Sequence, residues 1–136
     1  MAYPRVFTSY DFDNDRAQKT LFIGQSIHSQ TPFDIQDWSS KAALPQREWE
    51  QLVRAKINKC NMVVVLVGPK TYTATGVIKE IDFARSQNVP YFGVYVAGAN
   101  QYTPLPTGLP RNRVIPWRWD SISNAIDQLM NEGKNL

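Results

Sequence analysis

Apolar positions along the chain follow two different periods, and each period predicts one kind of element. Short apolar runs predict five strands, at residues 6–10, 33–35, 62–67, 91–96 and 113–115. Elsewhere apolar residues recur three and four positions apart, which predicts helices whose apolar stripes face a core. These stripes comprise Ala17 and Leu21, then Trp49, Val53, Ile57 and Cys60, then Val77, Ile81 and Ala84, and finally Ile122, Ile126 and Leu129.

The order of these elements predicts the class of fold. Strand and helix alternate along residues 1–136, which indicates an α/β protein of one domain with helices on both faces of a parallel sheet. The run at 62–67 is apolar throughout, as in a central strand covered on both faces. We therefore expect the strand order 2-1-3-4-5, with Val63, Val65 and Val94 buried. Ligands should bind where the strands end, at the loops after residues 10, 35 and 67.

Composition excludes several classes of function. Fifteen Lys and Arg residues against twelve Asp and Glu give a net charge of +3, spread along the chain, so we expect no nucleic-acid partner. No apolar run is long enough for a membrane span, and the start does not resemble a secretory leader, so we expect no membrane partner. The single cysteine, Cys60, fits a reducing, cytoplasmic compartment. Cys60 and the single histidine, His28, cannot build a usual zinc site, so we expect no intrinsic metal.

The loop after the first strand is acidic and lacks glycine. It contains Asp11, Asp13 and Asp15, which should repel a phosphate rather than bind it. A dinucleotide-binding fold of the Rossmann kind and an intrinsic flavin are therefore not expected. The carboxylates could instead pair with Arg16 or cap the following helix. A phosphorylatable receiver domain is excluded because its aspartate after the third strand is replaced here by Gly68 and Pro69.

The loop after the third strand is rich in hydroxyl groups, from Thr71, Tyr72, Thr73 and Thr75. With a glycine and a helix start behind it, this loop could form a cradle for an anion or a ribose. It could equally be an ordinary helix start capped by a hydroxyl.

Glu80 is the carboxylate in the following helix that we consider first. At about 100° per residue it lies with Val77 and Ala84 at the border of the apolar stripe, and its neighbours three and four positions away are uncharged. Lys79 and Asp82 should pair with one another on the outer face of the helix. A carboxylate at the edge of a pocket is a functional candidate, although its position alone also allows a structural role.

Three sequence blocks resemble the prokaryotic TIR-like family, which includes the TIR-like sensor proteins of Thoeris anti-phage defence. The blocks are residues 7–15, residues 33–39, and residues 64–68 with 77–84. The resemblance covers about residues 4–96 and implies a five-stranded flavodoxin-like sheet.

The resemblance also implies an activity, which is cleavage of the nicotinamide–ribose bond of NAD with Glu80 as the catalytic residue. NAD would be the substrate, with no separate cofactor, and the product would be an ADP-ribose derivative that activates a downstream effector. Self-association or a phage component would trigger the activity. The residues expected to contact substrate are Ser9, Tyr10, Asp11, Asp37, Trp38, Ser39, Thr71, Tyr72 and Thr73.

The chemistry is compatible with a single carboxylate. The nicotinamide of NAD is cationic and leaves as a neutral group, so no acid has to protonate it, whereas most glycosidases need two carboxylates. A carboxylate about 4 Å from the oxocarbenium charge contributes roughly 4 kcal/mol at an effective dielectric of 20. Two departures from the family pattern are Ala74 and Gly76, where relatives commonly have a serine and a tryptophan. A non-catalytic TIR-like module that binds a nucleotide or a protein therefore stays open, and Trp38 could simply cover the end of the sheet.

Overall fold

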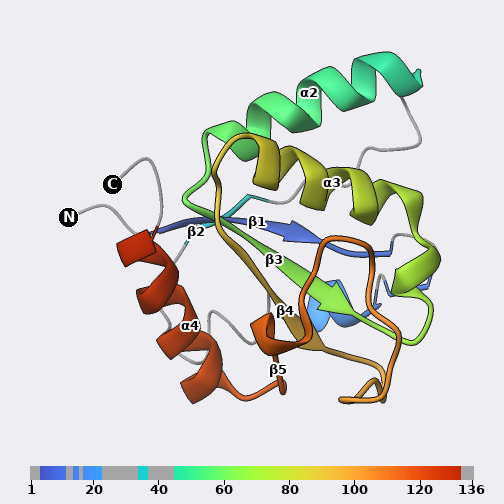
Figure 1. The fold of residues 1–136 in the computed structure, drawn as a ribbon, viewed down its shortest axis with the longest axis vertical. Helices are drawn as coiled ribbons and strands as arrows, with labels where there is room; N and C mark the ends of the chain where they lie inside the picture. The colour runs from blue at the N-terminus through green and yellow to red at the C-terminus, as the bar shows by residue number, and fades with distance from the viewer. Residues whose placement is uncertain (1–3, 12–13, 16, 23–33, 37–44, 133–136) are drawn as a thin grey trace.

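The computed structural model describes residues 4–11, 14–15, 17–22, 34–36 and 45–132, and the chain forms an α/β fold (Figure 1). The strands are β1 (Arg5–Ser9), β2 (Asp34–Gln36), β3 (Met62–Val67), β4 (Tyr91–Tyr95) and β5 (Val114–Ile115). They lie in the order β2-β1-β3-β4-β5, and every neighbouring pair is parallel. The predicted α/β class with a parallel sheet is confirmed.

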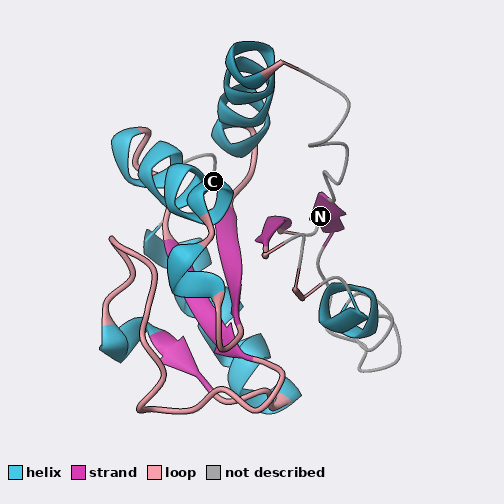
Figure 2. Cartoon of the chain, turned by 90° about the vertical axis from the view of Figure 1, so that its right-hand side faces the viewer, coloured by secondary structure: helices cyan, strands magenta, loops and turns pink. Residues whose placement is uncertain are grey.

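Helices cover both faces of this sheet (Figures 1 and 2). Helices α2 (Gln46–Asn58) and α3 (Thr75–Ser86) pack on one face, where the core includes Phe7, Val63 and Val65. Helix α4 (Trp119–Glu132) and the helical residues 17–22 pack on the other face. Short 3-10 turns, η2 (Thr71–Thr73) and η3 (Arg111–Arg113), precede α3 and β5.

The central strand β3 is covered on both faces of the sheet. All six residues of β3 are fully buried, because successive side chains alternate between the two cores. Val63, Val65 and Val94 have no exposed surface, which confirms the prediction for them. None of the helices in the described part of the chain is long and apolar enough to cross a membrane.

Two expectations from the helical periodicity are wrong. Leu21 is 54% exposed, whereas its neighbour Phe22 is fully buried. Phe22 is the buried residue because its ring packs against Trp117 and Trp119, at centroid distances of 6.0 and 5.1 Å. These partners are about a hundred residues away along the chain, so the local period could not select between the two side chains.

The expected ion pair between Lys79 and Asp82 is also absent from the described contacts. Lys79 Nζ instead lies 2.7 Å from Glu50 Oε1, which links α3 to α2. Asp82 pairs with Arg85 three residues later, at 2.9 Å. The packing of the two helices brings Glu50 to Lys79, and this long-range contact replaces the local pair.

Candidate active site

Glu80 lies on the buried face of α3, with Gly76, Val77 and Ala84. Its side chain is 8% exposed, so it is more deeply placed than a residue at the border of the stripe. Ser9 ends β1 on the same face of the sheet and is 1% exposed. The Ser9 hydroxyl donates a hydrogen bond of 2.6 Å to Glu80 Oε1, across 71 positions of sequence.

The Ser9–Glu80 bond fixes one carboxylate oxygen in space. A hydroxyl makes a stronger hydrogen bond to a carboxylate that is ionised than to a neutral acceptor. Both ends are carried by regular elements, a strand and a helix, so the position of the carboxylate is well defined. The pair lies near the carboxyl end of β1, the edge of a parallel sheet at which ligands bind.

The loop before α3 does not cap the helix with a hydroxyl. The helix begins after Ala74, and no side chain donates or accepts a capping bond there. The Thr73 hydroxyl donates instead to the carbonyl of Lys70, at 2.8 Å. The sequence allowed either a cradle for an anion or a ribose, or a helix start capped by a hydroxyl, and the second of these interpretations is wrong.

Thr71 joins the loops that follow β1 and β3. Its hydroxyl accepts a bond from the Gly68 N–H at 2.7 Å and donates to Asp15 Oδ2 at 3.0 Å. Thr71 is fully buried and Asp15 is 2% exposed. A Cβ added at Gly68 would overlap the Asp15 carboxylate, so only glycine permits this approach. Thr71 thus holds the two loops together and has no surface left for a ligand.

The environment of Asp15 raises the pKa of its carboxyl group. Burial is the main cause, because it disfavours the charged form, and the negative charge of Asp11 acts in the same direction. The hydrogen bond from Thr71 opposes both effects. Asp15 was expected to pair with Arg16 or to cap a helix, and its bond to Thr71 is a contact that the local sequence does not predict. The coincidence of a glycine and a threonine after β3 is the only local signal that could have indicated it.

The other predicted site residues divide between the two faces and the surface. Tyr10 is 8% exposed and packs in the core on the α4 side, opposite Ser9, with Lys19 Nζ 5.4 Å from its ring centroid. Asp11 is 7% exposed and accepts a bond of 2.7 Å from the Asn14 amide. Tyr72 and Thr73 are exposed beside the start of α3. Asp37, Trp38 and Ser39 lie outside the described residues.

The structure therefore brings Glu80 together with one of the predicted substrate contacts, Ser9. It places Tyr10 on the opposite face of the sheet, because side chains alternate along β1. Within the described residues, no group of three or more His, Cys, Asp and Glu side chains is arranged to hold a metal ion.

Comparison with known protein families identifies the kind of domain. The family described as Thoeris protein ThsB, TIR-like domain, matches residues 7–101, well over half of the chain. The chain belongs to this family. The matched region of the TIR-like domain includes the end of β1 with Ser9, the loop with Thr71, and α3 with Glu80.

Solved structures support the fold of this TIR-like domain. It is similar to the SEFIR domain of IL-17 receptor B, with a TM-score of 0.65 and 13% identity, over 97% of this chain and 98% of that one. It is also similar to a prokaryotic SEFIR domain, with a TM-score of 0.55 and 15% identity, over 94% and 90% of the two chains. No curated protein matches the chain. At these identities the likeness to SEFIR domains concerns the fold alone.

Proposed function

We propose that this TIR-like domain cleaves the nicotinamide–ribose bond of NAD, with Glu80 as the catalytic carboxylate. The observation that supports the proposal most directly is the placement of the Glu80 carboxylate near the carboxyl edge of the sheet, where Ser9 holds its Oε1 atom by a bond of 2.6 Å. Membership of the Thoeris TIR-like family supports it independently, because Glu80 matches the catalytic position implied by the family resemblance.

The reaction needs little from the protein beyond a placed negative charge. The bond between the ribose C1′ and the nicotinamide nitrogen breaks, and its electron pair neutralises the cationic nicotinamide as it leaves. Glu80 stabilises the positive charge that develops on the ribose, by about 4 kcal/mol at a separation of about 4 Å. Water or another nucleophile then bonds to C1′ and loses a proton, which gives a linear, cyclic or conjugated ADP-ribose product.

Ser9 acts in this proposal as a positioning residue and not as a direct substrate contact. With 1% of its surface exposed and its hydroxyl donated to Glu80, it orients the carboxylate. Asp11, Tyr72 and Thr73, together with residues 37–39, remain the proposed substrate contacts. Tyr10 and Thr71 are not among the proposed contacts, because Tyr10 packs in the α4-side core and the Thr71 hydroxyl is bonded to Asp15.

The proposed biological setting is cytoplasmic anti-phage defence. Self-association or a phage component would switch the activity on, and the ADP-ribose product would activate a separate effector protein. The proposal includes neither a nucleic-acid nor a membrane partner, and it needs no cofactor besides NAD as substrate.

A non-catalytic binding module is the second candidate. The low exposure of Glu80 and its bond to Ser9 favour it, because a buried helix-to-strand hydrogen bond also stabilises a fold. In that case the carboxylate joins α3 to β1, and the domain uses its surface to bind a nucleotide or a protein.

The two candidates differ in what a Glu80→Gln substitution does inside cells. We would measure nucleotides by mass spectrometry in cells that express the wild type or the variant, with and without phage. Loss of NAD and a new ADP-ribose species in the wild type alone is the result expected for the enzyme.

Asp82→Asn is the matched control, because Asp82 is an exposed carboxylate on the outer face of the same helix, paired with Arg85. It should behave as the wild type does. If Glu80→Gln also depletes NAD as the wild type does, Glu80 is not the catalytic group. If NAD is unchanged in all three during phage infection, the binding-module candidate is favoured.

A further inference from the structure

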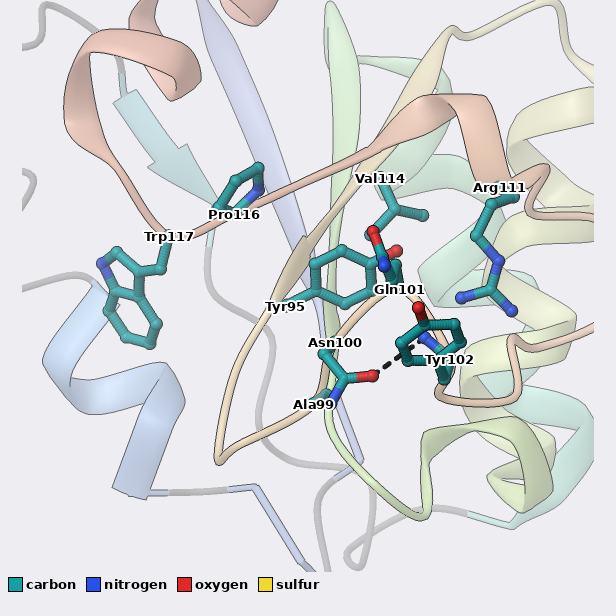
Figure 3. A pocket seen from close by; sticks show the side chains of 9 residues that line it. All are labelled: Tyr95, Ala99, Asn100, Gln101, Tyr102, Arg111, Val114, Pro116 and Trp117. Carbon is teal, nitrogen blue, oxygen red and sulfur yellow. Dashed lines mark hydrogen bonds between the residues drawn. The ribbon is translucent and has the colours of Figure 1, made fainter.

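A cavity of about 670 Å³ opens at the carboxyl ends of β4 and β5 (Figure 3). Its walls come from the end of β4, from residues 99–102, and from residues 111–117. The volume is within the range of small-molecule sites. None of its lining residues belongs to the proposed NAD site.

The loop that forms one wall is held by its own hydrogen bonds. The Ala99 N–H donates to the Val96 carbonyl at 3.0 Å, and the Asn100 and Thr103 residues exchange two bonds of 2.9 Å. The Tyr102 N–H donates to Asn100 Oδ1 at 2.8 Å. The turn into this loop uses a positive φ at Ala97, 55°, which an alanine adopts only under strain. The wall is therefore preformed, and a ligand would not have to order it.

The back of the same loop is anchored on the sheet. The Tyr91 hydroxyl donates to the Gly108 carbonyl at 2.6 Å. Leu109 packs over Gly93, where an added Cβ would lie 3.0 Å from Leu109 Cδ2. These contacts fix residues 108 and 109 against β4.

Aromatic rings make up much of the lining. Tyr95 ends β4 and is partly buried, and Trp117 packs from the other side with its ring against Phe22. Tyr102 is 83% exposed, although its backbone is fixed by the loop. An exposed aromatic ring on a preformed loop loses little conformational entropy on stacking, so it suits the flat face of a ligand ring.

The charge of the lining is positive. Arg111 is exposed and makes no ion pair or hydrogen bond with other described residues, whereas nearby Arg113 pairs with Glu132 and Arg118 with Asp120. The lining contains no aspartate or glutamate. A guanidinium without a partner favours a bidentate contact with a carboxylate or a phosphate.

We propose that this cavity binds a small planar aromatic molecule that carries a carboxylate or a phosphate group. The ring stacks on Tyr95 and Tyr102, Trp117 lines the far end of the cavity, and the anionic group pairs with Arg111. The amides of Asn100 and Gln101 lie beside the ring to bind its polar atoms. The cavity shares no lining residue with the proposed NAD site, and binding there does not depend on catalysis by Glu80.

The test is a titration of the full, ¹⁵N-labelled chain followed by two-dimensional NMR. The probes are indole-3-acetate for a ring with a carboxylate, AMP for a ring with a phosphate, and adenosine and inorganic phosphate as the separate halves. We expect one or both anionic aromatic probes to shift the amides of residues 99–102 and 111 and the Trp117 indole N–H. Adenosine and phosphate alone should bind about tenfold more weakly or worse.

Variants locate the contact within the cavity. Arg111→Gln should weaken binding of the anionic probe about tenfold or more, and Tyr102→Ala, at an exposed side chain, should weaken it without unfolding the protein. Arg118→Gln is the control, since Arg118 is an exposed arginine outside the lining, and it should bind as the wild type does.

Three results would overturn the proposal. The first is the absence of any shift at the cavity for either anionic probe at about 5 mM, a concentration at which even a site with a millimolar Kd is mostly occupied. The second is equal binding of the probe by Arg111→Gln and the wild type. The third is equal binding of adenosine and AMP by the wild type. If neither anionic probe shifts the cavity and AMP shifts only residues around Ser9 and Glu80, the cavity proposal fails while the NAD proposal stands.

Discussion

Two buried carboxylates near the carboxyl edge of the sheet make the same kind of contact, and we propose a catalytic role for only one of them. Glu80 accepts a hydrogen bond from Ser9, and Asp15 accepts one from Thr71. Each bond joins positions more than fifty residues apart. The two pairs differ, however, in the secondary-structure elements to which their residues belong.

Glu80 and Ser9 are held by a helix and a strand, whereas Asp15 and Thr71 lie in the two loops that follow β1 and β3. The Asp15 carboxylate also faces Gly68, whose missing side chain is what makes room for it. Asp15 is 2% exposed and Glu80 is 8% exposed. A buried hydroxyl–carboxylate bond therefore does not by itself indicate catalysis. The elements that hold the carboxylate, and whether a ligand can reach it, distinguish a candidate catalytic group from a structural one.

The largest expected difference is in the rate of NAD cleavage. Glu80→Gln keeps the shape of the side chain but removes its charge, so the rate should fall on the order of a hundred- to a thousandfold, from a loss of roughly 3–4 kcal/mol. Asp15→Asn should stay within about threefold of wild type. NAD consumption by the purified proteins, under conditions where the wild type is active, measures both. Equal losses in the two variants would remove the distinction between the carboxylates.

Gly68→Ala should destabilise the protein by about 1–3 kcal/mol, because the new Cβ displaces the Asp15 carboxylate and breaks its bond to Thr71. Urea denaturation measures the change. In an Asp15→Ala background the same substitution should cost much less, since the overlapping group is gone. Additive costs would show that Gly68 is needed for another reason.

Ser9→Ala and Thr71→Val should separate positioning from folding. Removing the Ser9 hydroxyl should lower kcat about tenfold, as expected for a lost hydrogen bond of about 1.4 kcal/mol to a charged group. Thr71→Val should lower the free energy of unfolding by about 1–2 kcal/mol and leave kcat nearly unchanged. Steady-state kinetics with a matched unfolding curve for each variant gives the comparison. A drop in kcat for Thr71→Val as large as that for Ser9→Ala would contradict it.

The smallest effect is a pH dependence of stability at Asp15. Because its pKa is raised in the folded state, the folded protein holds this proton more tightly than the unfolded chain does. Its contribution is complete below the usual pKa of 3.8 and is lost as the pH rises through the higher folded value. Asparagine does not titrate, so the stability of Asp15→Asn relative to wild type should increase over that range. Urea midpoints of the wild type and Asp15→Asn at about pH 3.5 and about pH 7 test this. If the difference in stability between the two proteins is the same at both pH values, the pKa of Asp15 is not raised by folding.

Local pattern was sufficient for the parallel sheet and for most of its helices. The fully apolar β3 and the stripe of Trp49, Val53 and Ile57 in α2 are set by backbone periods of two and 3.6, which can be read along the chain. Glu80 could also be predicted as a candidate from the sequence, since its helix, its uncharged neighbours and its match to a family position are all local features. The degree to which Glu80 is buried could not be predicted, because burial depends on what packs against the helix.

The sequence by itself determined which residues form strands and helices, and therefore the edge of the sheet where a site could lie. Only the tertiary structure decided the partners: Ser9 for Glu80, Thr71 for Asp15, Glu50 for Lys79, and the tryptophans for Phe22. It also decided that Arg111 and three aromatic rings meet around one cavity. The physical reason is that hydrogen bonds and packing act over a few ångströms of space, whereas these residues are brought that close only after the strands and helices have assembled.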